Sequence, residues 1–308
     1  LEAGPPSAGH TWMRAMKKFE GWAGVTLHDL LVAYRKAKAD CFFEKTFPSA
    51  AKFANYEADL VGNLELFLDQ LKAGGEFSKI EDLLGEYRLI PKKLKTERKH
   101  DVENCGHVHF SNSKRNFENI KNSFDVIPDF RVIGDFPVEA HILSALWINF
   151  IGHKLDAKLS KACYGARLRR VRPDGDGAGN FHSRSIGSFP PYFQAYQKWR
   201  SDGLNAIRRE LETDKHVIAV SLDLKSYYHT VDPGAISLPG LLDELGINLD
   251  AHEKEFNEQF SVFLKAWSDG AKSFCKSLSV DSEDLRGGLV IGLTASRVIS
   301  NVIIAKWD

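Results

Sequence analysis

A short apolar run, HVIAVSLDL at residues 216–224, carries one carboxylate, Asp223, close to its end. The run is rich in β-branched residues and has the length of a strand that is buried on both faces of a sheet. Two aromatic residues, Tyr227 and Tyr228, follow it closely. A buried strand can deliver such a carboxylate to a reaction centre, although an acid at a strand end is often only a cap or a turn former.

A glycine-rich turn leads into a helical pattern in GGLVIGLTASRVISNVIIAKWD, at residues 287–308. Gly288 and Gly292 lie in the turn, and Ser296 and Asn301 interrupt the apolar helix that follows. Backbone N–H groups at such a turn can contact a phosphate, but the signal is weak when it stands alone. The two segments together, an Asp-containing strand followed later in the chain by a glycine-rich turn, are a far more specific signal than either segment alone.

Helical periodicity covers most of the remaining sequence. Apolar residues recur at helical spacing, while Thr26 and Pro137 mark helix starts and the glycines at residues 74–75 mark a stop. Residues 87–123 show little periodicity, so we expect loops and short strands there. The predicted helices cover residues 26–43, 49–75, 137–160, 199–211, 250–279 and 293–307.

The composition is that of a globular protein without a strong overall charge. The 308 residues are 43% hydrophobic and 27% charged, and 41 basic residues balance 41 acidic ones. Any indication of a polyanionic partner must therefore come from local clusters of basic residues. No apolar run approaches the ~18 residues that span a membrane. Four cysteines without a repeated spacing fit reduced thiols, so we expect a cytoplasmic protein without a membrane segment.

The two segments described first resemble, as a pair, the sequence motifs of reverse transcriptases. DLKSYYHTVD, which begins at Asp223, is similar to motif A, with its pattern of Asp, aliphatic, Lys, small and two aromatic residues. The glycine-rich segment is similar to motif B, although Val290 and Ile291 replace the usual Pro-Gln and leave the template-strand contact there open. The motif B positions in register are Gly288, Gly292, Ser296, Asn301 and Asp308.

The sequence before these motifs resembles the fingers region of the same enzymes. FRVIGDFPVEAHILSALWINFIGHKLDAKLSKACYGARLRR and YFQAYQKWRSDGL are most similar to bacterial abortive-infection and defence-associated reverse transcriptases. The resemblance implies an α+β fold, mostly helical with a small antiparallel sheet, that forms right-hand polymerase fingers and part of a palm. The expected organisation is a leader or cloning remnant at 1–12, a helical N-terminal region at 13–84, fingers at 85–215 and a partial palm at 216–308.

The resemblance also implies roles for individual residues. Such polymerases use two divalent metals, here Mg²⁺, with Asp223 as a ligand and the backbone carbonyl of Leu224 as another. Tyr228 corresponds to the steric gate, whose ring excludes a ribose 2′ hydroxyl and so favours deoxynucleotides. Arg131 corresponds to the fingers arginine that binds the incoming triphosphate, a task suited to a guanidinium fork. Gly292 lies beside the nucleotide.

Basic clusters in the fingers region are candidates for contact with the phosphate backbone of a nucleic acid. Each has an alternative, because a charge run is usually a solvated face. In the same way, Arg131 could form a surface ion pair and Tyr228 could be a packing residue. The predicted nucleic-acid-binding residues are Lys92, Lys93, Arg167, Arg169 and Arg170.

The third family motif, an aromatic-x-Asp-Asp hairpin, does not occur in the 308 residues. We therefore expect a fragment of a longer protein in preference to a short pseudoenzyme. The implied activity is that of an RNA-directed DNA polymerase in antiphage defence, with deoxynucleoside triphosphates, an RNA template or DNA product, and a possible second copy of the chain as partners. Untemplated or protein-primed DNA synthesis is one alternative. A catalytically inactive nucleic-acid-binding scaffold is another.

Overall fold

The structure, a computed structural model, describes residues 17–44, 49–98, 112, 114–115, 118–119, 122, 124–171, 179–213, 216–278 and 288–305. One antiparallel pair of strands, β1 (Glu86–Arg98) and β2 (Phe124–Asp135), accompanies many helices. This mostly helical content with a small sheet agrees with the predicted α+β class. The α-helices are α1 (Leu27–Glu44), α2 (Ser49–Glu57), α3 (Leu60–Lys72), α5 (Val138–Trp147), α6 (His153–Asp156), α7 (Tyr192–Leu211), α8 (Tyr227–Thr230), α9 (Pro239–Glu244), α10 (Ala251–Ser277) and α11 (Ala295–Ile304).

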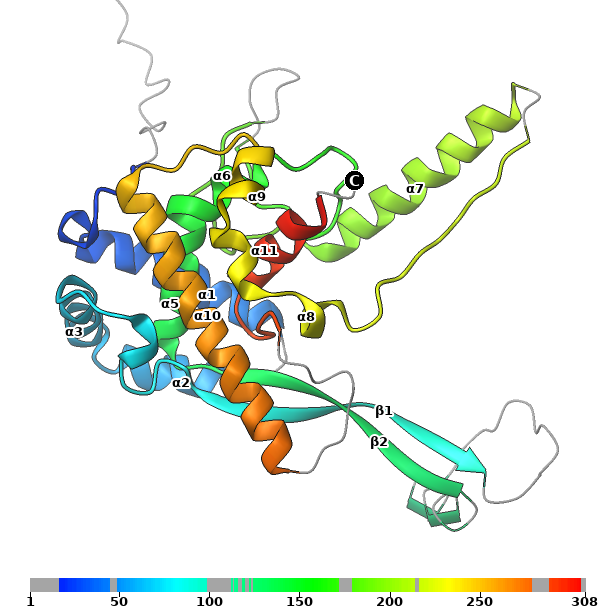
Figure 1. The fold of residues 1–308 in the computed structure, drawn as a ribbon, viewed down its shortest axis with the longest axis horizontal. Coiled ribbons are helices and arrows are strands. Elements are labelled where there is room, and N and C mark those ends of the chain that lie inside the picture. The colour runs from blue at the N-terminus through cyan, green and yellow to red at the C-terminus, as the bar shows by residue number, and fades with distance from the viewer. Residues whose placement is uncertain are drawn as a thin grey trace, which may run out of the picture.

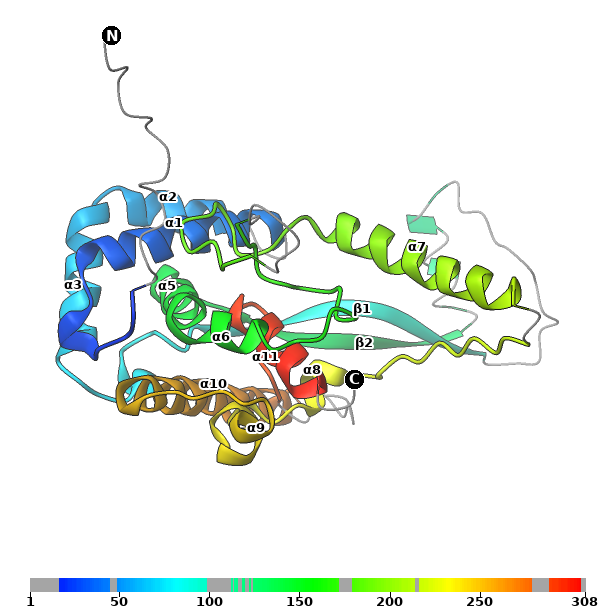
Figure 2. The same cartoon turned by 90° about the horizontal axis from the view of Figure 1, so that it is seen from above.

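The helical body has three layers, seen from above in Figure 2. Helices α1, α2 and α3 form one outer layer, and α9 and α10 form the other. Between them lies a continuous helical stretch made of α5, the π-helical turn η3 (Ile148–Gly152) and α6, with α11 beside it. A helix covered on both sides must be apolar around most of its circumference, and the central part of this stretch, residues 140–152, is.

Every residue of α5 except Glu139 and His141 is buried, which the sequence explains, since residues 140–152 include no Asp, Glu, Lys or Arg. His141 is partly exposed as a residue, but its ring nitrogen Nδ1 is buried, and this desolvation lowers the pKa of the imidazole to about 4, so the ring is neutral at pH 7. Pro137 precedes the first turn of α5, as predicted from the sequence. Across the described ranges, no helix has the length and apolarity needed to cross a membrane.

Three polar side chains on this central stretch, Ser144, Trp147 and Asn149, each bind a different neighbouring helix. Ser144 Oγ accepts a hydrogen bond from the backbone N–H of Ala295, at the start of α11, at 2.9 Å. Asn149 Oδ1 accepts one from Lys36 Nζ on α1 at 2.9 Å. The indole N–H of Trp147 donates to Asn257 Oδ1 on α10 at 3.0 Å. Because a buried polar group without a partner is costly, these bonds fix how the layers sit on the central helix.

Helix α10 begins at a capping box and packs along one apolar face. The Asp250 side chain accepts from the backbone N–H of Glu253, and the Glu253 side chain accepts from that of Asp250, which satisfies free donors of the first turn. Phe256, Phe260 and Phe263 are fully buried at helical spacing. The Phe260 ring stacks on Trp147 of α5, with ring centroids 5.3 Å apart. The predicted helix at residues 250–279 is therefore confirmed.

Strands β1 and β2 form a long twisted ribbon that extends away from the body (Figure 1). The pairing runs from Glu86 opposite Asp135 to Arg98 opposite Phe124, with an irregularity between Pro91 and Lys93. The sequence pattern predicts only a short extended piece before Pro91, because the Lys-rich run that follows lacks the alternation of a half-buried strand. At the base of the ribbon, Tyr87 packs against Trp267 and Phe274 of α10.

Helix α7 also extends away from the body, toward the same side as the ribbon (Figures 1 and 2). None of its residues is buried, even though aromatic residues occur along it. Tyr192, Tyr196 and Trp199 expose 84%, 56% and 53% of their surface. The described residues therefore leave the apolar side of this helix uncovered.

The segment at residues 216–224 is extended but pairs with no described strand, so the prediction that it forms a buried strand is wrong. Ile218, Val220 and Leu222 expose 89%, 75% and 89% of their surface. The sequence pattern predicts the extended conformation, but a strand also needs a neighbour that pairs its backbone N–H and C=O groups.

Replacing Asn257 should test how strongly α10 is fixed to the central helix. Asn257 is buried, accepts from Trp147 and donates from Nδ2 to the carbonyl of Ile236 at 2.8 Å. Asn257→Ala leaves both partners unpaired, so we expect the free energy of unfolding to fall by about 2–3 kcal/mol. Glu258→Ala, exposed on the same helix, is the control and should change it by less than ~0.5 kcal/mol in urea denaturation. Equal effects of the two variants would contradict this role.

Candidate functional site

The segment around Tyr228 lies directly against the glycine-rich turn. The backbone N–H of Leu289 donates to the carbonyl oxygen of Tyr228 at 2.7 Å. A Cβ atom on Gly288 would lie 2.4 Å from that same oxygen, closer than any side chain allows. Glycine at position 288 is therefore required for the two segments to meet.

The hydroxyl groups of the aromatic pair bind the helix that follows the turn. Tyr227 Oη donates to the backbone carbonyl of Ser300 on α11 at 2.8 Å. Ser300 Oγ donates to the carbonyl of Arg297 at 2.9 Å and lies 3.1 Å from Tyr228 Oη. Since the serine hydroxyl has one proton, Tyr228 is the donor in the second pair. Both rings are thus held in fixed orientations, half-buried against α11.

Gly292 brings the turn against the base of the β-ribbon. Its φ of 130° is open to glycine and strained for other residues, and a Cβ there would lie 2.6 Å from the carbonyl oxygen of Gly134 in β2. The Gly134 N–H also donates to the carbonyl of Ile291 at 2.9 Å. With Phe136 and Asp135, Gly292 lines a narrow cavity of about 30 Å³ at this junction.

Asn301 joins α11 to the loop that carries the Tyr-Gly-x-Arg sequence of residues 164–167. Its side-chain N–H group donates to the carbonyl of Gly165 at 2.7 Å and lies 3.4 Å from that of Ala166. Ala166 has a φ of 47°, an uncommon left-handed conformation for a residue with a side chain. The asparagine on α11 therefore supports a strained loop by binding its backbone.

Two of the predicted nucleic-acid-binding arginines bind a buried carboxylate instead of facing solvent. Arg167 Nε and Arg170 lie 3.0 and 2.7 Å from the two carboxylate oxygens of Asp156, at the end of α6. Arg167 also donates to the backbone carbonyls of Asp156 and Ser160 at 2.8 and 2.9 Å. Most of the Arg167 donors are thus used within the protein. These contacts give both residues a structural role, and their contact with a nucleic acid stays a prediction.

A cavity of about 630 Å³ opens beside the Tyr228 ring. Arg167, Arg169 and Arg297 line it, and Arg169 is oriented by a 2.9 Å bond from its Nε to the carbonyl of Phe189. The Arg297 guanidinium lies 5.6 Å from the centre of the Phe189 ring, within range of a cation–π contact. The cavity thus combines several guanidinium groups with aromatic walls, a combination that suits phosphates and bases.

One acid, Asp40 on α1, also lines this cavity, but its carboxylate is engaged. It accepts from the backbone N–H and the hydroxyl of Ser188 at 2.7 and 2.6 Å, and burial raises its pKa. One turn earlier, Lys36 is fully buried beside Asn149 and lies 4.3 Å from the Phe181 ring centre. Burial lowers the Lys36 pKa to about 7. The net charge that faces the cavity is therefore positive.

Asp223 and Leu224, the predicted metal ligands, lie in the exposed extended segment and do not line this cavity. A carboxylate and a backbone carbonyl are hard oxygen ligands of the kind that Mg²⁺ prefers. In the part of the chain that the structure describes, no three His, Cys, Asp or Glu residues gather as a metal site requires. The described residues therefore fit Mg²⁺ only in part, with Asp223 as one carboxylate.

The β-ribbon carries the other predicted contacts. Arg131 is exposed on β2, opposite Ile90 of β1, and is not among the residues that line the cavity beside Tyr228. The backbones of Lys92 and Lys93 lie in β1, while their side chains are outside the described residues. The structure thus groups Tyr228 with Arg167 and Arg169, and places the ribbon residues elsewhere.

Arg297 is the site residue that the motif comparison misses. It is the only charged residue of α11, one position after Ser296, and it reaches the cavity beside Thr294. A lone charge in an otherwise apolar helix was the available signal, because such a side chain must reach water or a partner. Tyr164 is a second lining residue, held by a 2.8 Å bond from its hydroxyl to Asp202 on α7.

Asp156→Ala should destabilise the loop that forms one wall of the cavity. The substitution leaves Arg167 and Arg170 without their carboxylate, and Asp156 is fully buried, so we expect a loss of about 3 kcal/mol in the free energy of unfolding. Asp269→Ala removes an exposed ion pair with Lys272 and should cost no more than ~1 kcal/mol. Thermal denaturation of both variants provides the test. A loss as small as that of Asp269→Ala would show that the arginines do not depend on Asp156.

Comparison of the chain with protein-family models, curated proteins and solved structures finds no match. The functional conclusion therefore depends on the motifs and on the geometry described above.

Proposed function

We propose that this chain is the fingers and part of the palm of a reverse-transcriptase-type nucleotidyltransferase that adds deoxynucleotides to a growing strand. The observation that carries the proposal is the contact between two segments about 60 residues apart, Tyr227–Tyr228 and the glycine-rich turn with α11. The two segments that resemble motifs A and B therefore lie against each other, and Gly288 leaves the space that this close contact requires.

The cavity beside Tyr228 supports the same proposal. Its guanidinium groups, Arg169 and Arg297 above all, suit the phosphates of a nucleotide or of a nucleic-acid strand. The Tyr228 ring, held through its hydroxyl by Ser300, forms a rigid wall at the position where a sugar would be selected. In this proposal, Arg131 on the ribbon contacts the triphosphate, and Lys92 and Lys93 contact the template or primer backbone.

The proposed chemistry requires metal-bound carboxylates. Asp223 is the proposed ligand, with the Leu224 carbonyl beside it, and Mg²⁺ would activate the attacking 3′ hydroxyl and neutralise the leaving pyrophosphate. The proposal also requires carboxylates from strands that pair with residues 216–224, whose exposed apolar side chains suit burial in a sheet. By the resemblance, the proposed setting is antiphage defence in the bacterial cytoplasm.

A nucleic-acid-binding scaffold without catalysis is the second candidate. The observation that favours it is the single carboxylate of Asp223, exposed and without two further acids beside it in the described ranges. A scaffold would keep the arginine-lined cavity and the basic ribbon but would not need Asp223. The two candidates therefore differ in what a substitution of Asp223 does.

Asp223→Ala in the full-length protein should abolish Mg²⁺-dependent nucleotide incorporation. The variant should keep its thermal stability, because the Asp223 side chain is exposed and contributes little to packing. Asp243→Ala, an exposed carboxylate of α9, is the matched control and should leave incorporation unchanged. Incorporation by Asp223→Ala at the wild-type rate would reject the polymerase and favour the scaffold.

Tyr228→Ala should weaken the discrimination against ribonucleotides. Removing the ring opens space beside the 2′ position, where shape had excluded an oxygen, and we expect the preference for deoxynucleotides to fall by roughly 10–100-fold, which is about 1.4–3 kcal/mol. Tyr228→Phe keeps the ring and removes the hydroxyl that bonds to Ser300, so it should retain the preference. The ratio of incorporation efficiencies for a deoxynucleotide and its ribonucleotide is the measurement. An unchanged ratio in Tyr228→Ala would make Tyr228 a packing residue.

A further inference from the structure

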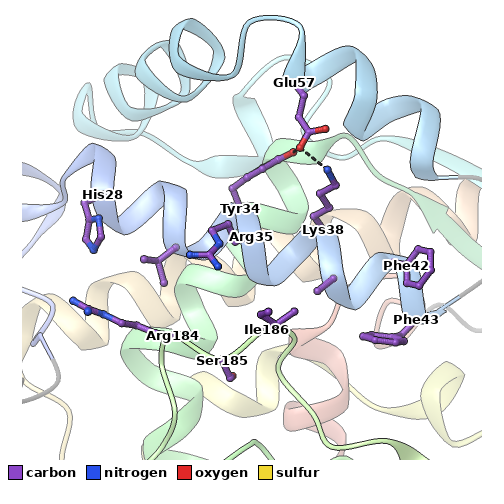
Figure 3. A pocket seen from close by; sticks show the side chains of 12 residues that line it. His28, Tyr34, Arg35, Lys38, Phe42, Phe43, Glu57, Arg184, Ser185 and Ile186 are labelled. Atoms are coloured by element: carbon purple, nitrogen blue, oxygen red, sulfur yellow. Dashed lines mark hydrogen bonds and ion pairs between the residues drawn. The ribbon is translucent and has the colours of Figure 1, made fainter. Parts of the chain in front are cut away.

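A second groove, of about 550 Å³, lies along the outer side of α1 (Figure 3). One wall is α1 itself, from His28 to Phe43, and the other is the loop that carries Arg184 and Ile186. None of these residues takes part in the contacts between motifs A and B. The groove therefore lies outside the contacts on which the proposed function rests.

The charge that faces the groove is positive. Arg35 on α1 and Arg184 on the opposite loop are both exposed, and Figure 3 shows their guanidinium groups extending into the same space near His28. Lys38 and Tyr34 both bind Glu57, with the Tyr34 hydroxyl 2.6 Å from its carboxylate, so the one acid of the groove is already neutralised. The surface is therefore complementary to a polyanion.

The opposite end of the groove is aromatic. Phe42 and Phe43 expose 71% and 65% of their surface, and their ring centroids are 5.6 Å apart at an interplanar angle of 74°. Ile186 across the groove is also 68% exposed. Exposed phenyl rings are costly in water, and they offer faces on which bases can stack. Guanidinium groups at one end and phenyl faces at the other are the two contacts that single-stranded nucleic acids use.

We propose that this groove binds a single-stranded nucleic acid, with its phosphates on Arg35 and Arg184 and a base on the Phe42–Phe43 pair. The proposal rests on the proposed function in one respect, that nucleic acid is the substrate. Phe43 lines both this groove and the cavity beside Tyr228. A strand that leaves the cavity past Phe43 would therefore enter the groove directly, so the groove extends the same binding site along α1.

Binding of a fluorescein-labelled single-stranded oligodeoxythymidine, or oligouridine, to the full-length protein tests the proposal. The anisotropy is measured in EDTA without nucleotides, so that catalysis does not contribute. Arg35→Glu/Arg184→Glu should raise the Kd at least about tenfold and reduce the slope of log K against log salt by about 1.4, as two lost phosphate contacts require. Phe42→Ala/Phe43→Ala should raise the Kd roughly tenfold with little change in that slope.

Lys72→Glu/Lys79→Glu is the matched control. Both lysines are exposed, near the end of α3 and in the short turn after it, and the double substitution changes the net charge by the same amount as the arginine pair. We expect it to leave both the Kd and the salt slope close to the wild-type values. An equal effect of the control and the arginine pair would show that overall charge governs binding, and would overturn the proposal.

Two further outcomes bear on the groove. In a competition experiment, polyglutamate and unlabelled polyuridine are each added to the bound oligonucleotide. Equal displacement by the two polymers would make the groove a site for acidic peptides and overturn the proposal. Unchanged binding by both double variants would do the same, even in an enzyme that incorporates nucleotides. A different result would reject only the proposed reaction: Asp223→Ala keeps full incorporation, while the Arg35/Arg184 and Phe42/Phe43 double variants weaken oligonucleotide binding as expected. The two proposals can therefore fail separately.

Discussion

This structure is organised around the helical stretch from α5 to α6, which lies between two layers of helices. It can lie there because its central residues, 140–152, include no Asp, Glu, Lys or Arg and are almost all buried. Apolar burial sets its depth but not its orientation, since the hydrophobic effect is not directional. Orientation comes from the isolated polar atoms of Ser144, Trp147 and Asn149, each of which binds one neighbouring helix.

The candidate site is attached to this helix at two points. In α5, Ser144 binds the first turn of α11, the helix that carries Arg297 and Ser300 to Tyr228. At its end, Asp156 binds Arg167 and Arg170 and so fixes the loop that forms the facing wall. The core of the protein therefore positions the arginine-lined cavity, because Ser144 and Asp156 of the buried helix bind the two elements that form its walls.

The sequence predicted the helices well and the strands poorly. Periodic segments such as residues 250–277 carry their own signal, because their packing partner only needs to be apolar. A strand also needs a particular neighbouring strand to pair with. The pattern predicts only short strands at residues 87–123, since the Lys-rich half of β1 shows no alternation, whereas β1 and β2 form a long ribbon. It also predicts a buried strand at residues 216–224, with which no described strand pairs.

The same limit applies to the site residues. The resemblance assigns Tyr228 to motif A and Gly288 to motif B, and the structure brings these two residues into contact. The sequence also grouped Arg167 with Arg169 and Arg170 as one basic cluster. In the structure, Asp156 at the end of α6 binds Arg167 and Arg170, so these two arginines have a structural partner that Arg169 lacks among the ion pairs of the described residues. The order of charges along the chain does not reveal which basic side chains a buried carboxylate will bind.

The measurement that most directly tests the proposed site is photochemical labelling of the full-length protein with an azido-substituted deoxynucleoside triphosphate, followed by peptide mapping. If the cavity beside Tyr228 binds the nucleotide, the label will lie in peptides that contain residues 164–169, 227–230 or 294–300, and an excess of unmodified deoxynucleotide will suppress it. Labelling confined to other peptides, or labelling that the unmodified nucleotide does not suppress, would contradict the assignment of this cavity.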